Sequence, residues 1–255
     1  MKIQYMSDLH LEMTANCHHL KRIYKPVTGD VLVLAGDTLY LNAEALPLKA
    51  FWQWASENYR QVIIIPGNHE FYHQCDVVEH GMQWEKMLYP NVGIYQNRVL
   101  RIDDTDFILS TLWSHIDTQY EYEIQRGLAD FHQTLHHGEL LTIQQYNQLH
   151  DYCLGFIKKA VAESTASHIV VVTHHLPTTL VVAPWHNNSP LSSAFATELG
   201  DYIADSNIDV WIYGHSHTNF DAKIGETMIV SNQLGNPYEY ESRPDSFDFG
   251  KFITI

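Results

Sequence analysis

Cysteine is scarce in this chain of 255 residues, whose three thiols are odd in number and far apart. Cys17, Cys75 and Cys153 lack the paired spacing that marks a zinc knuckle or a disulfide framework. The sequence therefore gives no support to a disulfide-stabilised or cysteine-ligated scaffold. We expect the three thiols to be reduced and to have structural roles.

Long hydrophobic runs are also missing. No segment approaches the roughly 18 consecutive apolar residues that mark a membrane-spanning helix. Residues 1–6 lead straight into a polar motif and lack the apolar core of a signal peptide. We therefore expect a cytoplasmic protein that does not associate with a membrane.

Nothing in the sequence marks a domain boundary. There is no linker rich in Pro, Gly or Ser, no repeat of fixed period and no low-complexity tract. With 45% hydrophobic residues, the chain can bury one large core. We therefore expect a single domain over residues 1–255. No coiled-coil seam or exposed apolar helix defines an oligomer.

Basic residues are few: 15 Lys and Arg stand against 30 Asp and Glu, for a formal net charge of -15. Such a surface repels polyanions, and the pairs Lys21-Arg22 and Lys158-Lys159 are too scattered to line a nucleic-acid strand. We therefore expect no extended nucleic-acid groove. Bound divalent cations would reverse the charge locally, so a small phosphorylated substrate is compatible with the composition.

Short apolar runs that end in polar residues indicate five buried strands, because their length and β-branched content fit strands better than helices. They cover residues 3–6, 31–35, 62–65, 169–173 and 210–213. Apolar residues recur at steps of three and four from Tyr146 to Val161, which indicates a helix, and residues 43–59 and 192–204 are further candidates. The alternation predicts an α/β fold with a mixed sheet, to which residues 227–230 and 251–255 contribute antiparallel strands.

A polar cluster follows each of the five predicted strands. Ligands of open α/β sheets gather beyond the carboxyl ends of the strands, so the five clusters predict one site. Their carboxylate, amide and imidazole groups are suitable metal ligands. The clusters are Asp8-Leu9-His10, Gly36-Asp37, Gly67-Asn68-His69-Glu70, Thr173-His174-His175 and Gly214-His215-Ser216-His217.

Each cluster alone also has an ordinary explanation, such as a turn, a helix cap or a surface histidine. Asp8 and His10 are two residues apart, so in extended chain their side chains would project to the same side and grip one cation. Asp37 has two oxygens that can bridge two ions, and Gly36 before it admits an unusual turn. Five such clusters at strand ends point together to a metal site.

This series of motifs resembles the calcineurin-like metallophosphoesterase superfamily, in the order of that family and over about four fifths of the chain. The resemblance implies a four-layer sandwich of two mixed β-sheets flanked by α-helices. It also implies two sets of metal ligands that share one aspartate, and no motif position is substituted. One set is Asp8, His10, Asp37 and His217, and the other is Asp37, Asn68, His174 and His215.

The resemblance further implies hydrolysis of phosphate esters with two divalent or trivalent metal ions. An all-nitrogen-and-oxygen ligand set suits Mn, Fe, Zn or Ni. Water shared by two ions about 3.5 to 4 Å apart becomes hydroxide near neutral pH and is the expected nucleophile. Asp37 would bridge the ions, and His69, which is not a ligand in the family, is the expected general acid, oriented by Asp37 or Asp8.

Three further residues are candidates for supporting or substrate-contacting positions. His175 is an alternative to His174, but the family's ligand directly follows the Thr at the strand end, which leaves His175 behind it. Trp113 precedes residues 114–165, a candidate helical cap insertion that is alternatively a surface insertion. Trp185 lies in a loop between prolines, after the fourth cluster, where substrate-shaping elements occur.

Small phosphomonoesters or phosphodiesters are the favoured substrates, because the metal core serves both and no polyanion track is apparent. A cyclic-nucleotide or short-nucleotide phosphodiesterase is the next hypothesis, followed by a protein phosphatase. Outside the enzymes, the alternative is a non-catalytic binding scaffold of the kind that degenerate relatives form. The complete ligand set and the intact His69 argue against a scaffold.

Overall fold

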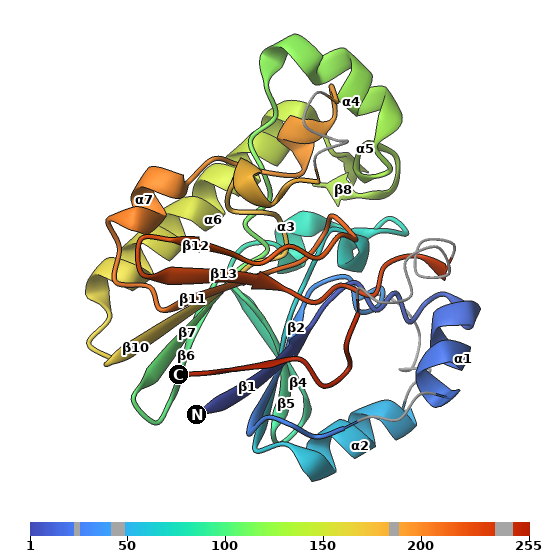
Figure 1. The fold of residues 1–255 in the computed structure, drawn as a ribbon. Coiled ribbons are helices and arrows are strands. Elements are labelled where there is room, and N and C mark those ends of the chain that lie inside the picture. Colours follow the sequence, from blue (N-terminus) through green and yellow to red (C-terminus); the bar gives the residue numbers. More distant parts are fainter. Residues whose placement is uncertain (23–25, 42–48, 184–188, 238–246) are drawn as a thin grey trace.

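Two six-stranded β-sheets lie face to face in the computed structural model, with helices on their outer surfaces (Figure 1). The structure describes residues 1–22, 26–41, 49–183, 189–237 and 247–255. The fold is therefore α/β, and the two mixed sheets flanked by helices confirm the architecture that the sequence predicts.

Each sheet has four parallel strands in its centre and one antiparallel strand at each edge. The first sheet has the order β14-β1-β2-β3-β5-β4, with β14 and β4 antiparallel to their neighbours. The second has the order β12-β13-β11-β10-β7-β6, with β12 and β6 antiparallel. The strands of the first sheet are β1 (Lys2–Met6), β2 (Val31–Ala35), β3 (Gln61–Ile65), β4 (Trp84–Tyr89), β5 (Val92–Gln96) and β14 (Phe252–Thr254). Those of the second are β6 (Arg98–Ile102), β7 (Thr105–Leu109), β10 (His168–Val172), β11 (Val210–Tyr213), β12 (Ala222–Ile224) and β13 (Thr227–Ser231).

The prediction of antiparallel strands holds for one closing segment and in part for the other. β14 pairs antiparallel with β1, as predicted for residues 251–255. β13, which includes residues 227–230, pairs antiparallel with β12 but parallel with β11. The reason is that β12 provides the return pass: a turn at Gly225 joins it antiparallel to β13, so the chain re-enters the sheet in the parallel direction.

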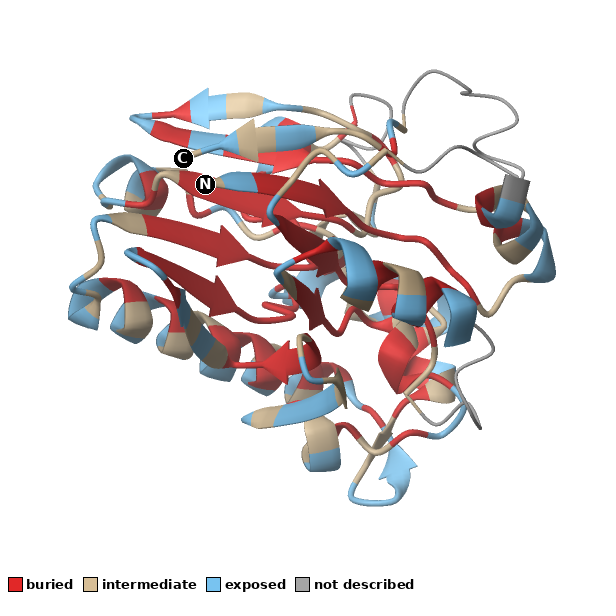
Figure 2. Cartoon of the chain, turned by 90° about the horizontal axis from the view of Figure 1, so that it is seen from below, coloured by how far each residue is buried: buried red, intermediate tan, exposed pale blue. Residues whose placement is uncertain are grey.

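Alternate residues of the central strands face opposite sides of the sheet, because side chains in a strand alternate. Val33 of β2 and Ile63 of β3 face the second sheet, whereas Leu34 and Ile64 pack beneath Trp52 of α2. All five side chains are buried, and the central strands are buried along most of their length (Figure 2). Burial on both faces explains why these strands read as continuous apolar runs in the sequence.

Helices cover the outer face of each sheet. α1 (Thr14–Arg22) and α2 (Lys49–Asn58) lie on the first sheet, and α6 (Ile143–Glu163) and α7 (Gly200–Ala204) lie on the second. α6 includes the helix predicted from Tyr146 to Val161, and it begins at a capping box in which Thr142 and Gln145 satisfy each other's backbone N–H groups. The first part of the helix predicted at residues 43–59 lies outside the described residues.

The single helix predicted for residues 192–204 is wrong. The segment contains a short 3-10 helix, η5 (Ser192–Ala194), and α7 begins only at Gly200. Between them, Ala196 forms a parallel bridge with Leu176, and the Glu198 carboxylate accepts hydrogen bonds from Thr178 and Thr179. These tertiary contacts favour extended backbone over the continuous helix that local periodicity suggests.

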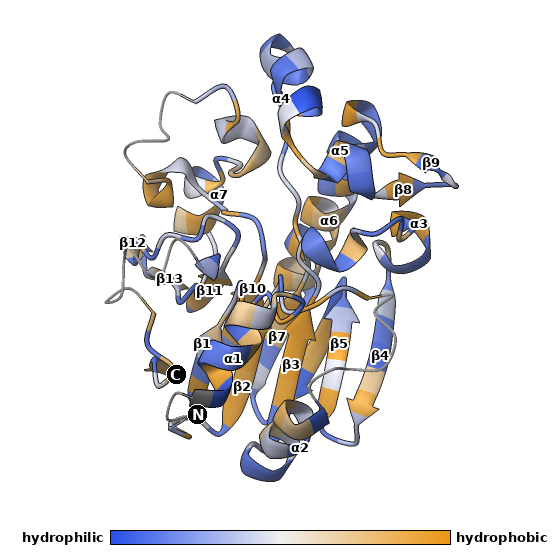
Figure 3. Ribbon diagram, turned by 90° about the vertical axis from the view of Figure 1, so that its right-hand side faces the viewer, coloured by the Kyte–Doolittle hydropathy of each residue, from blue (hydrophilic) through white to orange (hydrophobic). Residues whose placement is uncertain are grey.

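A separate apolar cluster lies at the end of the sandwich beyond the carboxyl ends of the parallel strands (Figure 3). It joins the first half of α6 to residues of the short elements around it, including Trp113, Ile124, Phe131 and Tyr146. The short elements that contribute are α3 (Val77–His80), α4 (Glu121–Gly127), α5 (Asp130–Gln133) and the 3-10 helices η1 (His69–Phe71) and η2 (Thr118–Tyr120). The strands β8 (Leu135–His136) and β9 (Glu139–Leu140) lie at the same end of the molecule, and η3 (Thr179–Val181) packs through Val181 in the cluster beneath α6 and α7. The role of residues 114–165 as a cap stays a prediction.

Two predicted absences can be compared with the structure. Cys17, Cys75 and Cys153 are free thiols, of which Cys75 and Cys153 are buried. Within the described part of the chain, no helix combines the length and the apolar character needed to cross a membrane.

The inter-sheet core is expected to dominate stability. Replacing Ile63, which is fully buried between the sheets, by alanine should lower the free energy of unfolding by about 2–5 kcal/mol, because it leaves a cavity in a close-packed region. Val99→Ala, at a side chain 46% exposed on β6, is the control and should change it by less than about 0.5 kcal/mol. Urea denaturation measures both, and equal effects would contradict this account of the core.

Candidate metal centre

The structure brings all seven predicted ligands together beyond the carboxyl ends of β1, β2, β3, β10 and β11. Three groups of potential ligand atoms form there among the described residues, each within 4.8 Å. One is His10, Glu12 and His69, and the other two, here called the first and second clusters, contain the predicted ligands and share Asp37. The first contains Asp8, His10, Asp37 and His217, the second contains Asp37, His174 and His215, and Asn68 joins the second through His174.

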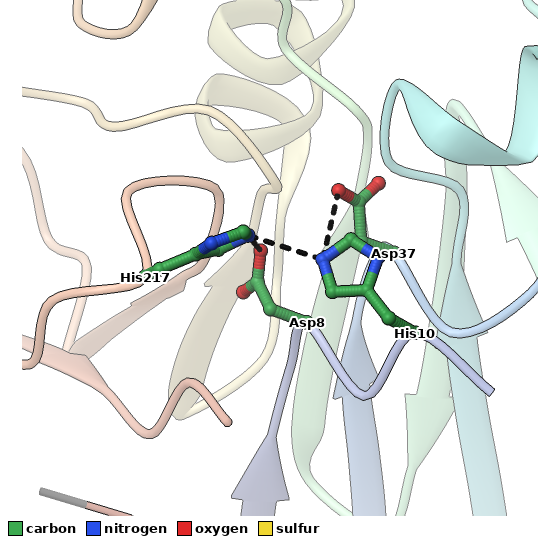
Figure 4. A group of neighbouring side chains, drawn as sticks. All are labelled: Asp8, His10, Asp37 and His217. Carbon is green, nitrogen blue, oxygen red and sulfur yellow. Dashed lines mark hydrogen bonds and ion pairs between the residues drawn. The ribbon is translucent and has the colours of Figure 1, made fainter. Parts of the chain in front are cut away.

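In the first cluster, the side chains of Asp37 and His217 lie at short range from those of His10 and Asp8 (Figure 4). His10 Nε2 lies 3.0 Å from His217 Nε2 and 3.8 Å from Asp37 Oδ2. His217 Nε2 lies 3.4 Å from Asp8 Oδ1. The nitrogen and oxygen atoms point toward one shared volume, which is the arrangement that a single cation requires.

In the second cluster, His174 is the central residue. Its Nε2 lies 3.0 Å from Asn68 Oδ1 and 3.3 Å from Asp37 Oδ1. Its Nδ1 lies 2.9 Å from the carbonyl oxygen of Ala35, which can only accept, so Nδ1 carries the proton and Nε2 has its lone pair available. Three lone-pair-bearing atoms therefore face each other, an arrangement that a cation stabilises.

The fourth imidazole of the ligand set, that of His215, supplies an independent test of fit to a metal ion. Nε2 of His215 is buried and has no hydrogen-bond partner among the described residues. A buried, unsatisfied nitrogen is costly in a folded protein and calls for a ligand. Burial, helped by the neighbouring His175 and His174, holds the pKa of His215 well below its usual range, so the ring is neutral and able to coordinate. The donor set fits two divalent cations.

Asp37 is ionised although it is fully buried. Burial opposes ionisation, but His174, His69 and His10 hold the pKa of its carboxyl well below the ordinary value. The same pairing acts on His174: burial would lower the pKa of the imidazole, and Asp37 more than offsets it, raising the pKa to about 9. Without a metal ion, Nε2 therefore also holds a proton, and a cation bound there would displace it and take up the lone pair. The site is therefore a dense arrangement of mutually stabilised charges.

Five of the seven predicted ligands have left-handed backbone conformations, which non-glycine residues rarely adopt. Their φ angles are 53° at Asp8, 43° at His10, 51° at Asp37, 77° at His215 and 51° at His217. The extended geometry expected for Asp8 and His10 is therefore wrong. Sharp turns after each strand, and not the alternation of a strand, aim these side chains into the site, at a cost of about 1–3 kcal/mol per residue.

Two motif glycines are required by close approach within the site. A side chain at Gly36, whose φ is +88°, would collide with the ring of His174. A side chain at Gly67 would collide with Asp37 Oδ1. The glycines of the second and third motifs therefore make room for the ligands of the neighbouring strands.

Glu70 joins the second and third motifs, a role that the sequence analysis did not assign. Its buried carboxylate accepts hydrogen bonds from the backbone N–H groups of Asp37 at 2.9 Å, Thr38 at 2.7 Å, Leu39 at 3.3 Å and Gly67 at 2.7 Å. Burial and the charge of Asp37 raise the pKa of Glu70, and the backbone N–H donors of Thr38 and Gly67 oppose this rise. Glu70 thereby fixes the turn that positions Asp37.

Glu12 is a second residue that the sequence analysis missed. Its Oε1 lies 3.0 Å from His10 Nδ1 and 3.4 Å from His69 Nδ1. His69 Nε2 lies 3.9 Å from Asp37 Oδ2. Burial would lower the pKa of His69, but Asp37 and Glu12 raise it above its ordinary value. Glu12 thus faces His69 in addition to Asp37, and its place two residues after His10 was the available signal.

A buried hydrogen-bond chain connects residues 114–165 to the predicted ligand Asn68. Tyr72 Oη donates to Asp130 Oδ2 at 2.9 Å and accepts from Asn68 Nδ2 at 2.9 Å. Because the amide nitrogen is held by Tyr72, the amide oxygen is turned toward His174. Asp130 of α5 therefore sets the orientation of a side chain in the metal site.

The structure places the three supporting candidates differently. His175 Nε2 lies 3.0 Å from Tyr146 Oη, and its ring packs 4.1 Å from that of His215, between centroids. Trp113 is fully buried in the cluster beside α6, with its ring 5.4 Å from that of His175. Trp185 lies outside the described residues. The ring of His175 thus packs against that of His215, and the ring of Trp113 packs against that of His175.

Comparison with known proteins agrees with this fold. The model of the calcineurin-like phosphoesterase family matches residues 1–219, so the chain belongs to this family of metallophosphoesterases. An uncharacterized protein, L509, from Acanthamoeba polyphaga mimivirus is 29% identical over 275 residues, covering 93% of this chain and 95% of its own length. The family membership makes the chain a phosphoesterase that binds metal.

One solved structure has a similar fold over nearly the whole chain. The phosphopantetheinyl hydrolase PptH from Mycobacterium tuberculosis superimposes with a TM-score of 0.64 at 16% identity, covering 96% of this chain and 93% of its own. At this identity the likeness concerns the fold.

Glu70 is expected to be necessary for a tightly held metal site. Glu70→Gln places an amide N–H against backbone N–H groups that now donate hydrogen bonds to the carboxylate. The substitution should therefore lower the free energy of unfolding by about 1–3 kcal/mol and weaken Mn²⁺ binding. Calorimetric Mn²⁺ titration and urea denaturation measure the two effects. Glu226→Gln, at a side chain 96% exposed, is the control. Unchanged metal affinity in Glu70→Gln would contradict this role.

Proposed function

We propose that the protein hydrolyses small phosphomonoesters or phosphodiesters with two metal ions held by the seven ligands described above. The observation that carries the proposal is the single buried carboxylate of Asp37, which faces both ligand clusters. When bound, two such ions supply an activated water and neutralise the charge of the phosphate. The nitrogen and oxygen ligands suit Mn, Fe, Zn or Ni, and the choice of manganese stays a prediction.

His69 is the proposed general acid. Its side chain is 22% exposed, whereas those of His10 and His174 are fully buried, so its ring can be reached from the solvent side of the site. Nδ1 faces the Glu12 carboxylate, which leaves Nε2 to hold a proton toward the leaving oxygen of the ester. The carboxylates of Glu12 and Asp37 favour the protonated ring that this role requires.

Several properties favour a small substrate. The net charge of -15 disfavours polyanions, and metal ions would provide the positive charge that basic side chains provide elsewhere. A cyclic or short nucleotide is the next substrate class, followed by a phosphoprotein. The cytoplasmic location, the absence of an extended nucleic-acid groove and the lack of membrane association stay predictions.

A substrate panel tests the reaction class. Manganese-supplemented protein is assayed with p-nitrophenyl phosphate, bis-p-nitrophenyl phosphate, a cyclic nucleotide, a short oligonucleotide and a phosphopeptide. A phosphopantetheinylated protein completes the panel because PptH, which has a similar fold, is a phosphopantetheinyl hydrolase. We expect hydrolysis of the two small aryl esters at rates well above those of the polymers. Inertness toward every ester would overturn the proposal and favour a binding scaffold.

Two substitutions separate the proposed acid from the proposed ligands. His69→Ala should retain two metal ions per chain but lose about 10²–10⁴-fold in activity on esters with poor leaving groups, and less on p-nitrophenyl phosphate, which needs little protonation. Asp37→Ala should lose metal and activity together, because it removes a side chain common to both clusters. Metal analysis and leaving-group series measure these effects. Full activity of His69→Ala on esters with poor leaving groups would contradict the assignment of His69 as the general acid.

A further inference from the structure

An apolar cavity of about 90 Å³ lies in the loop region between β10 and α7. Leu176, Ala183, Leu191 and Phe195 contribute its apolar walls, and serine side chains supply the few polar groups. Among the described lining residues there is no Lys, Arg, Asp or Glu. These described residues therefore offer no side chain that pairs with a charged group.

This cavity lies next to the candidate metal centre. Ser216, which lines it, stands in the chain between the predicted ligands His215 and His217. The ring of Phe195, another lining residue, packs against the ring of His215 with 4.5 Å between centroids. Leu176, a third lining residue, follows His174 by two residues. A group bound here would therefore contact residues that adjoin the metal ligands.

The size of the cavity selects among uncharged groups. Its volume is well above the roughly 10–15 Å³ that a cavity needs to hold one water molecule and below the roughly 150 Å³ of a dry cavity that binds benzene. A short linear or branched alkyl group fits these limits. A nucleobase, which is larger than benzene, does not.

We infer that this cavity, defined by Leu176, Ala183, Leu191, Phe195 and Ser216, binds a short alkyl group of the substrate while the metal centre binds its phosphate. The inference rests on the proposed function and narrows it to phosphoesters of small apolar alcohols. The gain comes from removing hydrocarbon from water, which amounts to about a fourfold increase in affinity for each buried methylene group.

Binding of alkylphosphonates tests the inference without turnover, because their carbon–phosphorus bond is not an ester. Methyl-, ethyl-, propyl- and hexylphosphonate are titrated by calorimetry into the manganese-loaded protein. We expect the Kd to fall about fourfold per methylene from methyl to propyl, about 16-fold in total, and to level off or rise at hexyl when the cavity is full. The readout is the ratio of the methyl- to the propylphosphonate Kd.

Two lining variants and a matched control assign the effect to this cavity. Leu191→Asp places a carboxylate in the wall of the cavity. Val182 also lines the cavity, and Val182→Phe fills its space. Both substitutions should bring the ratio of the methyl- to the propylphosphonate Kd close to one. Leu180→Asp makes the same charge change at a residue 69% exposed outside the cavity and should keep the ratio. Two variants of different chemistry protect the test against misfolding of either, which thermal denaturation monitors.

The outcomes distinguish the two proposals. A flat series in the unsubstituted protein, or an unchanged ratio in folded Leu191→Asp and Val182→Phe, would overturn the alkyl subsite and leave phosphoester hydrolysis intact. Failure of every phosphonate to bind, together with an inert substrate panel, would overturn both. The inference is supported if affinity rises from methyl- to propylphosphonate in the unsubstituted protein and in Leu180→Asp, and if the ratio of the two Kd values falls close to one only in the lining variants.

Discussion

The buried carboxylate of Asp37 is the constraint on which the site depends. An ionised carboxylate removed from water costs several kcal/mol unless charges and hydrogen bonds compensate it. Here His174 lies 3.3 Å from one oxygen and His10 3.8 Å from the other, while the backbone N–H of His69 donates to Oδ1 at 2.9 Å. Glu70 in turn holds the backbone N–H of Asp37. The interaction with Asp37 therefore holds each of these groups in its position.

The two-sheet architecture supplies those partners from segments far apart in the chain. β1, β2 and β3 are parallel in one sheet, as are β10 and β11 in the other, and the turns after all five strands meet at one end of the sandwich. The apolar layer between the sheets, with Val33, Ile63 and Val172, sets the distance between them. Stability therefore comes from the core, while the strained turns and clustered charges at its end oppose stability and provide the chemistry.

The sequence predicts those parts of the molecule that depend on strong local patterns. β2 and β11 match the predicted ranges because a short, continuous apolar run between polar residues is compatible with few structures other than a buried strand. The motif residues come together because each directly follows a strand, and these strands end at the same edge of the sandwich. Edge strands such as β4 and β6 were not predicted, since one-sided exposure removes the apolar run. The left-handed turns at Asp8 and His10 were mistaken for extended chain, because no glycine marks them.

Contacts made across the fold were beyond the reach of local patterns, and they tie residues 114–165 to the metal centre. Asp130 reaches Asn68 through Tyr72, and Tyr146 reaches His215 through the ring of His175. Both paths consist of buried side chains, where an unpaired polar group is costly, so each member is held in one orientation by the next. A shift of α5 or α6 would therefore turn an amide or an imidazole at the site, although neither helix provides a ligand. The segment beside the site thus contributes to the geometry of the ligands, independently of any role in covering them.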